Sequence, residues 1–122
     1  MNMRAVTTCM LLIATSSVAI AEAPKQGTLT EEQQHGRALF GASCSYCHGE
    51  RGHATALLAK RLGKDHAQLE QRTDLSATLI RHVVRHGINS MPWYRRAELT
   101  DRELDAIAAY LTRNQPLSNQ SK

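Results

Sequence analysis

The sequence contains few of the residues that usually stabilise a small domain. Its 122 residues include three cysteines, one tryptophan and one phenylalanine, and aromatic residues make up 4% of the chain. Three cysteines are too few for a disulfide framework, which needs several pairs. Scarce aromatic residues and a formal net charge of only +4 argue against a nucleic-acid partner, because such proteins carry a basic stripe and stacking platforms.

Long hydrophobic runs are also missing. The apolar stretch at residues 10–20 contains polar residues and falls short of the about 20 apolar residues that a membrane-spanning helix needs. A polar start with Arg4 precedes it, and the small residues of Ala19-Ile20-Ala21 follow. This order is typical of a secretory signal peptide. We therefore expect residues 1–21 to be removed, the protein to be periplasmic and no stable membrane insertion; an uncleaved anchor is the alternative.

Helical spacing dominates the remaining chain, and no strand-like alternation occurs, so the sequence predicts an all-α fold. Thr30 and Gln33 form a capping box for a first helix, and Thr100 and Glu103 form one for the last. Ser76 caps a further helix that ends at residue 86. We also expect short helices at residues 55–62 and 65–72. The inward positions of the last two long helices are expected at Leu79, Ile80, Val83, Val84, Leu104, Ile107, Ala108 and Leu111.

The expected domain organisation is simple. Residues 22–28 form a flexible lead-in, residues 29–114 form one domain, and residues 115–122 form a polar tail.

The pentapeptide at residues 44–48, Cys-Ser-Tyr-Cys-His, is the attachment pattern of a c-type haem. The two thiols, of Cys44 and Cys47, add to the vinyl groups of the porphyrin, and the imidazole of His48 then lies under the ring, where it binds the iron. Five residues alone leave zinc or thiol chemistry open. However, no βαβ pattern surrounds the motif as a thioredoxin-like site requires, and only His53 is near enough to extend a zinc site.

A second iron ligand is expected from Met91, the only methionine after residue 21. It lies in a loop, and Pro92 follows it and prevents a helix there. A thioether raises the reduction potential relative to more basic ligands. Two alternatives stay open: Met91 as a core filler, and a second imidazole in its place. The candidate imidazoles belong to His35, His53, His66, His82 and His86.

Four segments in this order resemble a class I monohaem cytochrome c: residues 36–40, the haem motif 44–49, Ser90-Met91-Pro92 and a capped last helix ending near Tyr110. The resemblance implies three main helices plus short helices wrapped around one covalently bound haem c. It also implies that the first and last helices cross where Gly36 lets Tyr110 approach.

By the same resemblance, Cys44 and Cys47 carry the thioethers, His48 is the proximal iron ligand and Met91 the distal one. Such a protein is not an enzyme. It carries single electrons from a flavin- or quinone-dependent dehydrogenase to an oxidase or another cytochrome. The chain is also similar to the cytochrome subunits of para-cresol methylhydroxylase and eugenol hydroxylase. The alternative is a peroxidase-like haem enzyme or a sensor, with an open or displaceable sixth ligand.

The chain departs from this family in having no proline between Pro24 and Pro92, where a proline carbonyl usually accepts the proximal imidazole N–H. A carbonyl within residues 55–58 is expected to replace it. Candidates for binding the haem propionates are Arg85, Trp93 and Tyr94, with ordinary loop packing as the alternative. A basic rim that steers an acidic partner, or merely solvated surface charge, is expected from Arg51, Lys60, Arg61, Lys64, Arg95 and Arg96.

Overall fold

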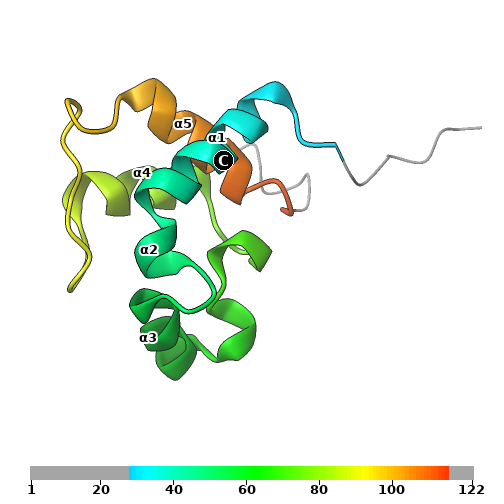
Figure 1. Ribbon diagram of the computed structural model, residues 1–122. Coiled ribbons are helices and arrows are strands. Elements are labelled where there is room, and N and C mark those ends of the chain that lie inside the picture. Colours follow the sequence, from blue (N-terminus) through cyan, green and yellow to red (C-terminus); the bar gives the residue numbers. More distant parts are fainter. Residues whose placement is uncertain (1–27, 116–122) are drawn as a thin grey trace, which may run out of the picture.

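The computed structural model describes residues 28–115, which are built from helices (Figure 1). In chain order the elements are α1 (Glu31–Ser43), α2 (Ser45–His48), α3 (His53–Leu62), the 3₁₀ turns η1 (Lys64–His66) and η2 (Leu69–Gln71), α4 (Ala77–His86) and α5 (Asp101–Leu111). No strand forms in this part of the chain, so the all-α prediction is confirmed. The expected signal peptide, nearly all of the lead-in and residues 116–122 of the tail lie outside the described residues.

None of the helices within residues 28–115 combines the length and the apolar character needed to cross a bilayer.

Local capping signals determine where α1 and α5 begin. Thr30 accepts a hydrogen bond from the backbone of Gln33 at 3.2 Å, and the Gln33 side chain accepts one from the Thr30 N–H at 3.1 Å. Thr100 and Glu103 repeat this reciprocal pair at α5, with distances of 3.3 Å and 2.7 Å. Both predicted capping boxes are therefore confirmed.

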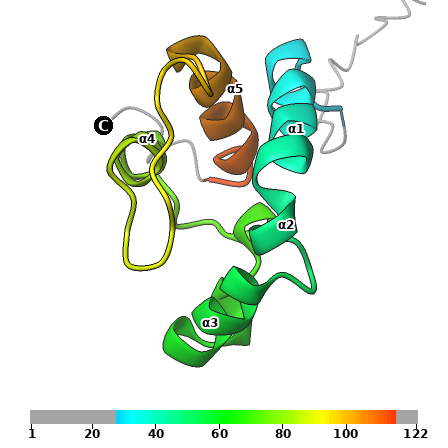
Figure 2. The same cartoon turned by 60° about the vertical axis from the view of Figure 1, so that its left-hand side comes forward.

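Helices α1 and α5 pack against each other and lie side by side in Figure 2. Gly36 makes this possible, because a Cβ at that position would lie 1.9 Å from the carbonyl oxygen of Ala106. Tyr110 packs on Phe40 instead, with ring centroids 6.1 Å apart, and its hydroxyl donates to the Glu70 carboxylate. The predicted packing of the first helix on the last is confirmed, and the group nearest to Gly36 is the backbone of Ala106.

The core lies where α4 joins this pair. Its buried residues are Phe40, Leu75, Ile80, Val84, Leu99, Leu104, Ile107, Ala108, Tyr110 and Leu111. The predicted inner face of α5 is confirmed. On α4 the inward positions Ile80 and Val84 are buried, whereas Leu79 is 45% exposed, so its predicted burial is wrong. The reason is that, among the described helices, α4 packs mainly on α5, so that only one narrow face of α4 is covered.

Residues 65–72 do not form the predicted helix. The segment breaks into η1 and η2, joined by Ala67 and an extended Gln68. Ala67 is buried and Leu69 is half-buried. Residues two positions apart, as Ala67 and Leu69 are, do not share a face of a helix, so a continuous helix could not bury both. The chain therefore leaves the helical path at this point to turn both apolar side chains inward.

Candidate functional site

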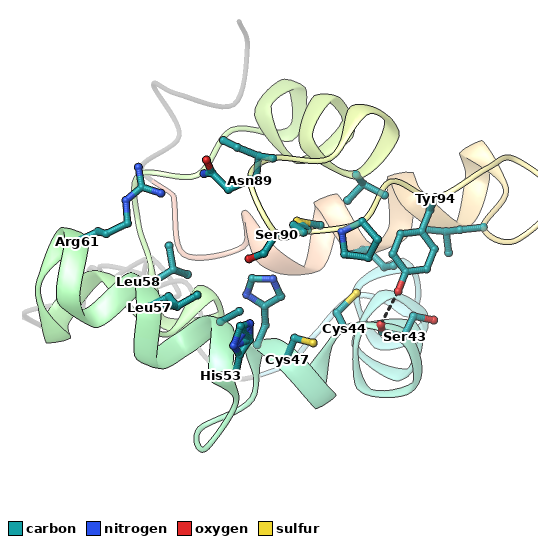
Figure 3. Close-up of a pocket in the computed structure, with 18 residues that line it drawn as sticks. Ser43, Cys44, Cys47, His53, Leu57, Leu58, Arg61, Asn89, Ser90 and Tyr94 are labelled. Atoms are coloured by element: carbon teal, nitrogen blue, oxygen red, sulfur yellow. Dashed lines mark hydrogen bonds between the residues drawn. The ribbon is translucent and has the colours of Figure 1, made fainter.

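A cavity of about 410 Å³ opens between α2, α3, the end of α1 and the segment 88–94 (Figure 3). Apolar side chains supply much of its wall, among them those of Leu57, Leu58, Val84 and Ile107. The volume falls within the range of about 300–1,000 Å³ that is typical of sites for organic ligands. This cavity brings together the four site residues expected from the sequence, since Cys44, Cys47, His48 and Met91 all line it.

The haem motif folds as a tight turn of helix directly after α1. Cys44 ends α1 and begins α2, and its carbonyl accepts from the N–H groups of Cys47 at 3.2 Å and His48 at 2.9 Å. Gly52 closes the turn, because a Cβ there would lie 2.1 Å from the Cys47 carbonyl oxygen. As a result, two thiols and an imidazole face one cavity from a stretch of five residues.

Met91 lines the cavity from the segment that follows α4, far along the chain from the haem motif. Gly87 ends α4 with a φ of +71°, and Asn89 adopts a φ of +52°. Ile88 and Met91 then exchange two backbone hydrogen bonds, of 3.3 Å and 2.9 Å, which close a tight turn. Glycine and asparagine are the residues that tolerate such positive φ values. The local sequence thus fixes the turn that places Met91 half-buried at the wall.

Tyr94 and Arg85 anchor this turn to the rest of the fold. The Tyr94 N–H donates to the Val84 carbonyl at 2.8 Å, and the Tyr94 hydroxyl donates to the Ser43 carbonyl at 3.0 Å. The Arg85 guanidinium donates to the Tyr94 carbonyl at 3.0 Å and to the Leu99 carbonyl at 2.8 Å. The Met91 loop is therefore fastened to the end of α1, next to Cys44.

The same bonds bear on the residues that the sequence suggested for binding the haem propionates. The sequence proposed Arg85, Trp93 and Tyr94 as partners for haem propionates. The polar end of Arg85 is engaged with carbonyl groups and, at 2.8 Å, with Asp101, while the Tyr94 hydroxyl is engaged with Ser43. Trp93 is 58% exposed and does not line the cavity. In the described structure Arg85 and Tyr94 hold the loop, which matches the alternative of ordinary packing.

A comparison with protein families matches residues 31–111 to the family described as cytochrome C oxidase, cbb3-type, subunit III. The chain belongs to this family. It is accordingly a c-type cytochrome, an electron-transfer protein with covalently bound haem c and its iron. Comparisons with curated proteins and with solved structures gave no match.

The cavity of this cytochrome fits a haem iron at His48. His48 lines the cavity beside both cysteines, so its ring can offer one nitrogen to an iron held there; the other nitrogen, Nδ1, is buried and has no hydrogen-bond partner among residues 28–115. Burial, followed by the neighbouring His53, lowers the pKa of His48. The imidazole is therefore neutral at pH 7, the state in which histidine binds metals.

The carbonyl expected to accept from His48 is not found within residues 55–58. Thr55 lies in this range, but its hydroxyl donates to the Gly49 carbonyl at 2.8 Å and so ties the start of α3 to the haem motif. The predicted substitute carbonyl is therefore not seen, since Nδ1 has no hydrogen-bond partner among the residues that the structure describes.

The thiols are poorly suited to the rival chemistries. Burial, and to a lesser extent the nearby Cys47, raises the pKa of Cys44 to about 11. A dithiol oxidoreductase needs the opposite, a lowered pKa that yields a thiolate. Among residues 28–115 no group of three or more histidine, cysteine, aspartate or glutamate side chains is placed to hold a metal ion. A closed zinc site, which needs four ligands, thus lacks its ligand set in the described part of the chain.

The histidines are unevenly placed relative to the cavity. All six lie within the described residues, and only His48 and His53 line it. His82 and His86 stack on each other on the exposed side of α4, with ring centroids 4.4 Å apart. A second imidazole ligand would therefore have to come from His53, on α3.

The sequence did not indicate that two residues lining the cavity, Arg61 and Asn89, belong to the site. The sequence predicts a place for Arg61 in a basic rim and predicts no role for Asn89. A signal for Arg61 was present, because it follows Leu57 by four positions and so shares a helix face with it. No comparable signal existed for Asn89, whose side chain comes to the cavity only through the turn at residues 88–91.

Proposed function

We propose that this cytochrome is a periplasmic monohaem carrier of single electrons between a dehydrogenase and a respiratory acceptor. Cys44 and Cys47 form the thioethers, and His48 and Met91 bind the iron on its two faces. The observation that carries the proposal is the convergence of these four side chains, from two distant segments, on one apolar cavity. When bound, the haem supplies the one-electron redox chemistry; the protein supplies attachment, axial ligands and a low-dielectric enclosure.

The residues explain why the iron would stay six-coordinate. Met91 is held from both ends, by the turn at Ile88 and by the bonds of Tyr94. Its sulfur is a neutral donor that favours ferrous iron. With both faces occupied, no coordination site remains for a substrate, which favours electron transfer over peroxidase-like catalysis or ligand sensing.

The direct test is Met91→Leu, a substitution that keeps the volume and removes the sulfur. The expected results are a lower midpoint potential, loss of the weak long-wavelength band of methionine-bound ferric iron, and new binding of carbon monoxide. Ser90→Ala, one residue earlier in the same turn, serves as the control and should leave all three properties unchanged. If carbon monoxide binds the unmodified protein readily and the potential of Met91→Leu is unaltered, the open-iron alternative is correct.

Attachment is tested separately. Haem staining after denaturing electrophoresis should detect covalent haem in the unmodified protein and none in the Cys44→Ala/Cys47→Ala double variant. A pyridine haemochrome assay should give one haem per chain. Staining that survives loss of both cysteines would refute the assignment.

Export and maturation support the proposed location. Covalent attachment of haem c is carried out outside the cytoplasm, which agrees with the signal peptide expected at residues 1–21. Mass spectrometry of the haem-loaded protein from a periplasmic extract should place the new N-terminus at Glu22. Haem-loaded chains that retain residues 1–21 would support an anchor instead.

The partners are proposed from chemistry. The family description names a subunit of a cytochrome c oxidase, which favours an oxidase or another cytochrome as acceptor. A flavin- or quinone-dependent dehydrogenase, of the para-cresol methylhydroxylase type, is the proposed donor. The basic rim is weaker than expected, since Arg95 pairs with Glu98 and Arg96 with Asp101. Co-purification from the periplasm, repeated at increasing salt, tests whether any contact is weak and electrostatic.

A further inference from the structure

The cavity has two chemically different ends. Figure 3 shows Cys44 and Cys47 on one side, and Arg61 and Asn89 well apart from them on the other. Leu57 and Leu58 of α3 lie between these ends. The attachment residues and the polar, cationic residues therefore mark opposite sides of one apolar space.

Arg61 is an unusual residue for this wall. It is the only lysine or arginine among the lining residues, and no aspartate or glutamate lines the cavity to offset its charge. Within residues 28–115 its guanidinium makes no hydrogen bond or ion pair, whereas the two terminal nitrogens of Arg85 on α4 donate to the Tyr94 and Leu99 carbonyls and to Asp101. Arg61 is exposed overall, so an always-charged group stands at the rim of an apolar space and forms no ion pair with any of residues 28–115.

Haem c carries its own pair of carboxylates. Its two propionates lie on the side of the porphyrin away from the two thioether positions. With the thioethers at Cys44 and Cys47, the carboxylates would be directed toward the opposite end of the cavity. We propose that Arg61 binds a haem propionate through a charge-assisted hydrogen bond, with the Asn89 amide as a second donor. This inference rests on the proposed attachment at the two cysteines.

The pairing would have a consequence for the iron. A guanidinium beside a propionate offsets its negative charge, and a negative charge near the iron favours the ferric state. Arg61→Gln should therefore lower the midpoint potential and shift the ferric-to-ferrous equilibrium about threefold to tenfold toward ferric iron at low salt. Arg61→Lys keeps the positive charge but lacks the planar guanidinium, so its midpoint potential should lie between those of the unmodified protein and Arg61→Gln.

Two further variants sharpen the test. Lys60→Gln removes the same charge from the adjacent position of α3, outside the cavity lining, and should leave the potential nearly unchanged. Asn89→Gly removes the amide while tolerating the φ of +52°, and should lower the potential less than Arg61→Gln does. All variants are compared as haem-loaded protein by redox titration.

The outcomes separate this inference from the proposed function. If Arg61→Gln keeps its covalent haem and its potential matches that of Lys60→Gln, the propionate assignment is wrong and the electron carrier stands. If the unmodified protein carries no covalent haem, the proposed function itself fails. Should Arg61→Gln not fold, an Arg61→Lys protein with an unaltered potential, together with an unaltered Asn89→Gly protein, would overturn the assignment.

Discussion

Gly36 is the position at which a single added methyl group should do most damage to this cytochrome. In Gly36→Ala the new Cβ would lie 1.9 Å from the Ala106 carbonyl oxygen. Carbon and oxygen atoms in contact normally stay about 3.3–3.6 Å apart, so α1 and α5 would have to separate by roughly 1.5 Å. Because the obstacle is backbone, no side chain can rotate away to relieve it.

The size of the effect follows from two opposing terms. Overpacking of this kind costs about 3 kcal/mol, at the upper end of the usual range. Alanine's better helix propensity returns about 0.5–1 kcal/mol. The free energy of unfolding should therefore fall by about 2 kcal/mol. For a domain of this size that corresponds to a decrease of roughly 8–16 °C in melting temperature.

Gly41, one and a half turns further along α1, provides a matched control. A Cβ there meets nothing within 4 Å, so Gly41→Ala should raise the free energy of unfolding by about 0.5–1 kcal/mol through helix propensity alone. Urea unfolding of both haem-loaded variants, followed by far-ultraviolet circular dichroism, measures the difference. Equal stability of the two variants would refute the packing argument.

Three other substitutions test single hydrogen bonds and ion pairs, near the site and away from it. Hydrogen bonds from Arg96 and then Arg85 lower the pKa of Asp101. The ionised carboxylate therefore stabilises the fold at neutral pH, and this stabilisation is lost as the pH falls from about 4 through the lowered pKa. In urea unfolding at pH 3 and pH 7, Asp101→Asn should show a smaller difference in the free energy of unfolding than the unmodified protein. Tyr94→Phe should cost about 1 kcal/mol and speed carbon monoxide binding in stopped-flow mixing, because the bond to Ser43 is removed. Tyr110→Phe should cost about 1 kcal/mol without altering the potential, since its partner Glu70 lies outside the cavity.

The features that the sequence predicted well are those with local causes. Thr30, Ser76 and Thr100 each cap a helix through a bond to a residue three positions away, and all three predictions are confirmed. A cap of this kind depends on its own few residues and little else. For the same reason the helix at 55–62 was placed correctly except for its start at His53, where Gly52 is the N-cap and no side chain signals it.

The features that the sequence did not predict depend on distant parts of the chain. Ala67 and Leu69 turn inward because of the core they meet, and this breaks the helix expected at 65–72. Leu79 is apolar like a buried residue, but on its side of α4 residues 28–115 leave it 45% exposed. In the site, the attachment motif is contiguous and could be found by spacing alone. The arrangement of Arg85 could not, because its partners Tyr94, Leu99 and Asp101 follow it by 9 to 16 positions and lie outside α4.

The arrangement of the helices also indicates which part of the fold depends on the haem. Helices α1, α4 and α5 share the buried core, whereas α3 packs on α2 and η1 and makes no comparable contact with those three in the described structure. The cavity lies between α3 and the Met91 loop, with Ile107 of α5 also in its wall. A haem that fills it would join α3 and this loop to the core. The weak fold that a small core implies for the haem-free chain should thus be concentrated there, because elements with few buried contacts open first. Met91 and His48 would then do more than ligate iron, since their bonds to it would cross-link the two parts of the domain that the polypeptide itself leaves loosely connected.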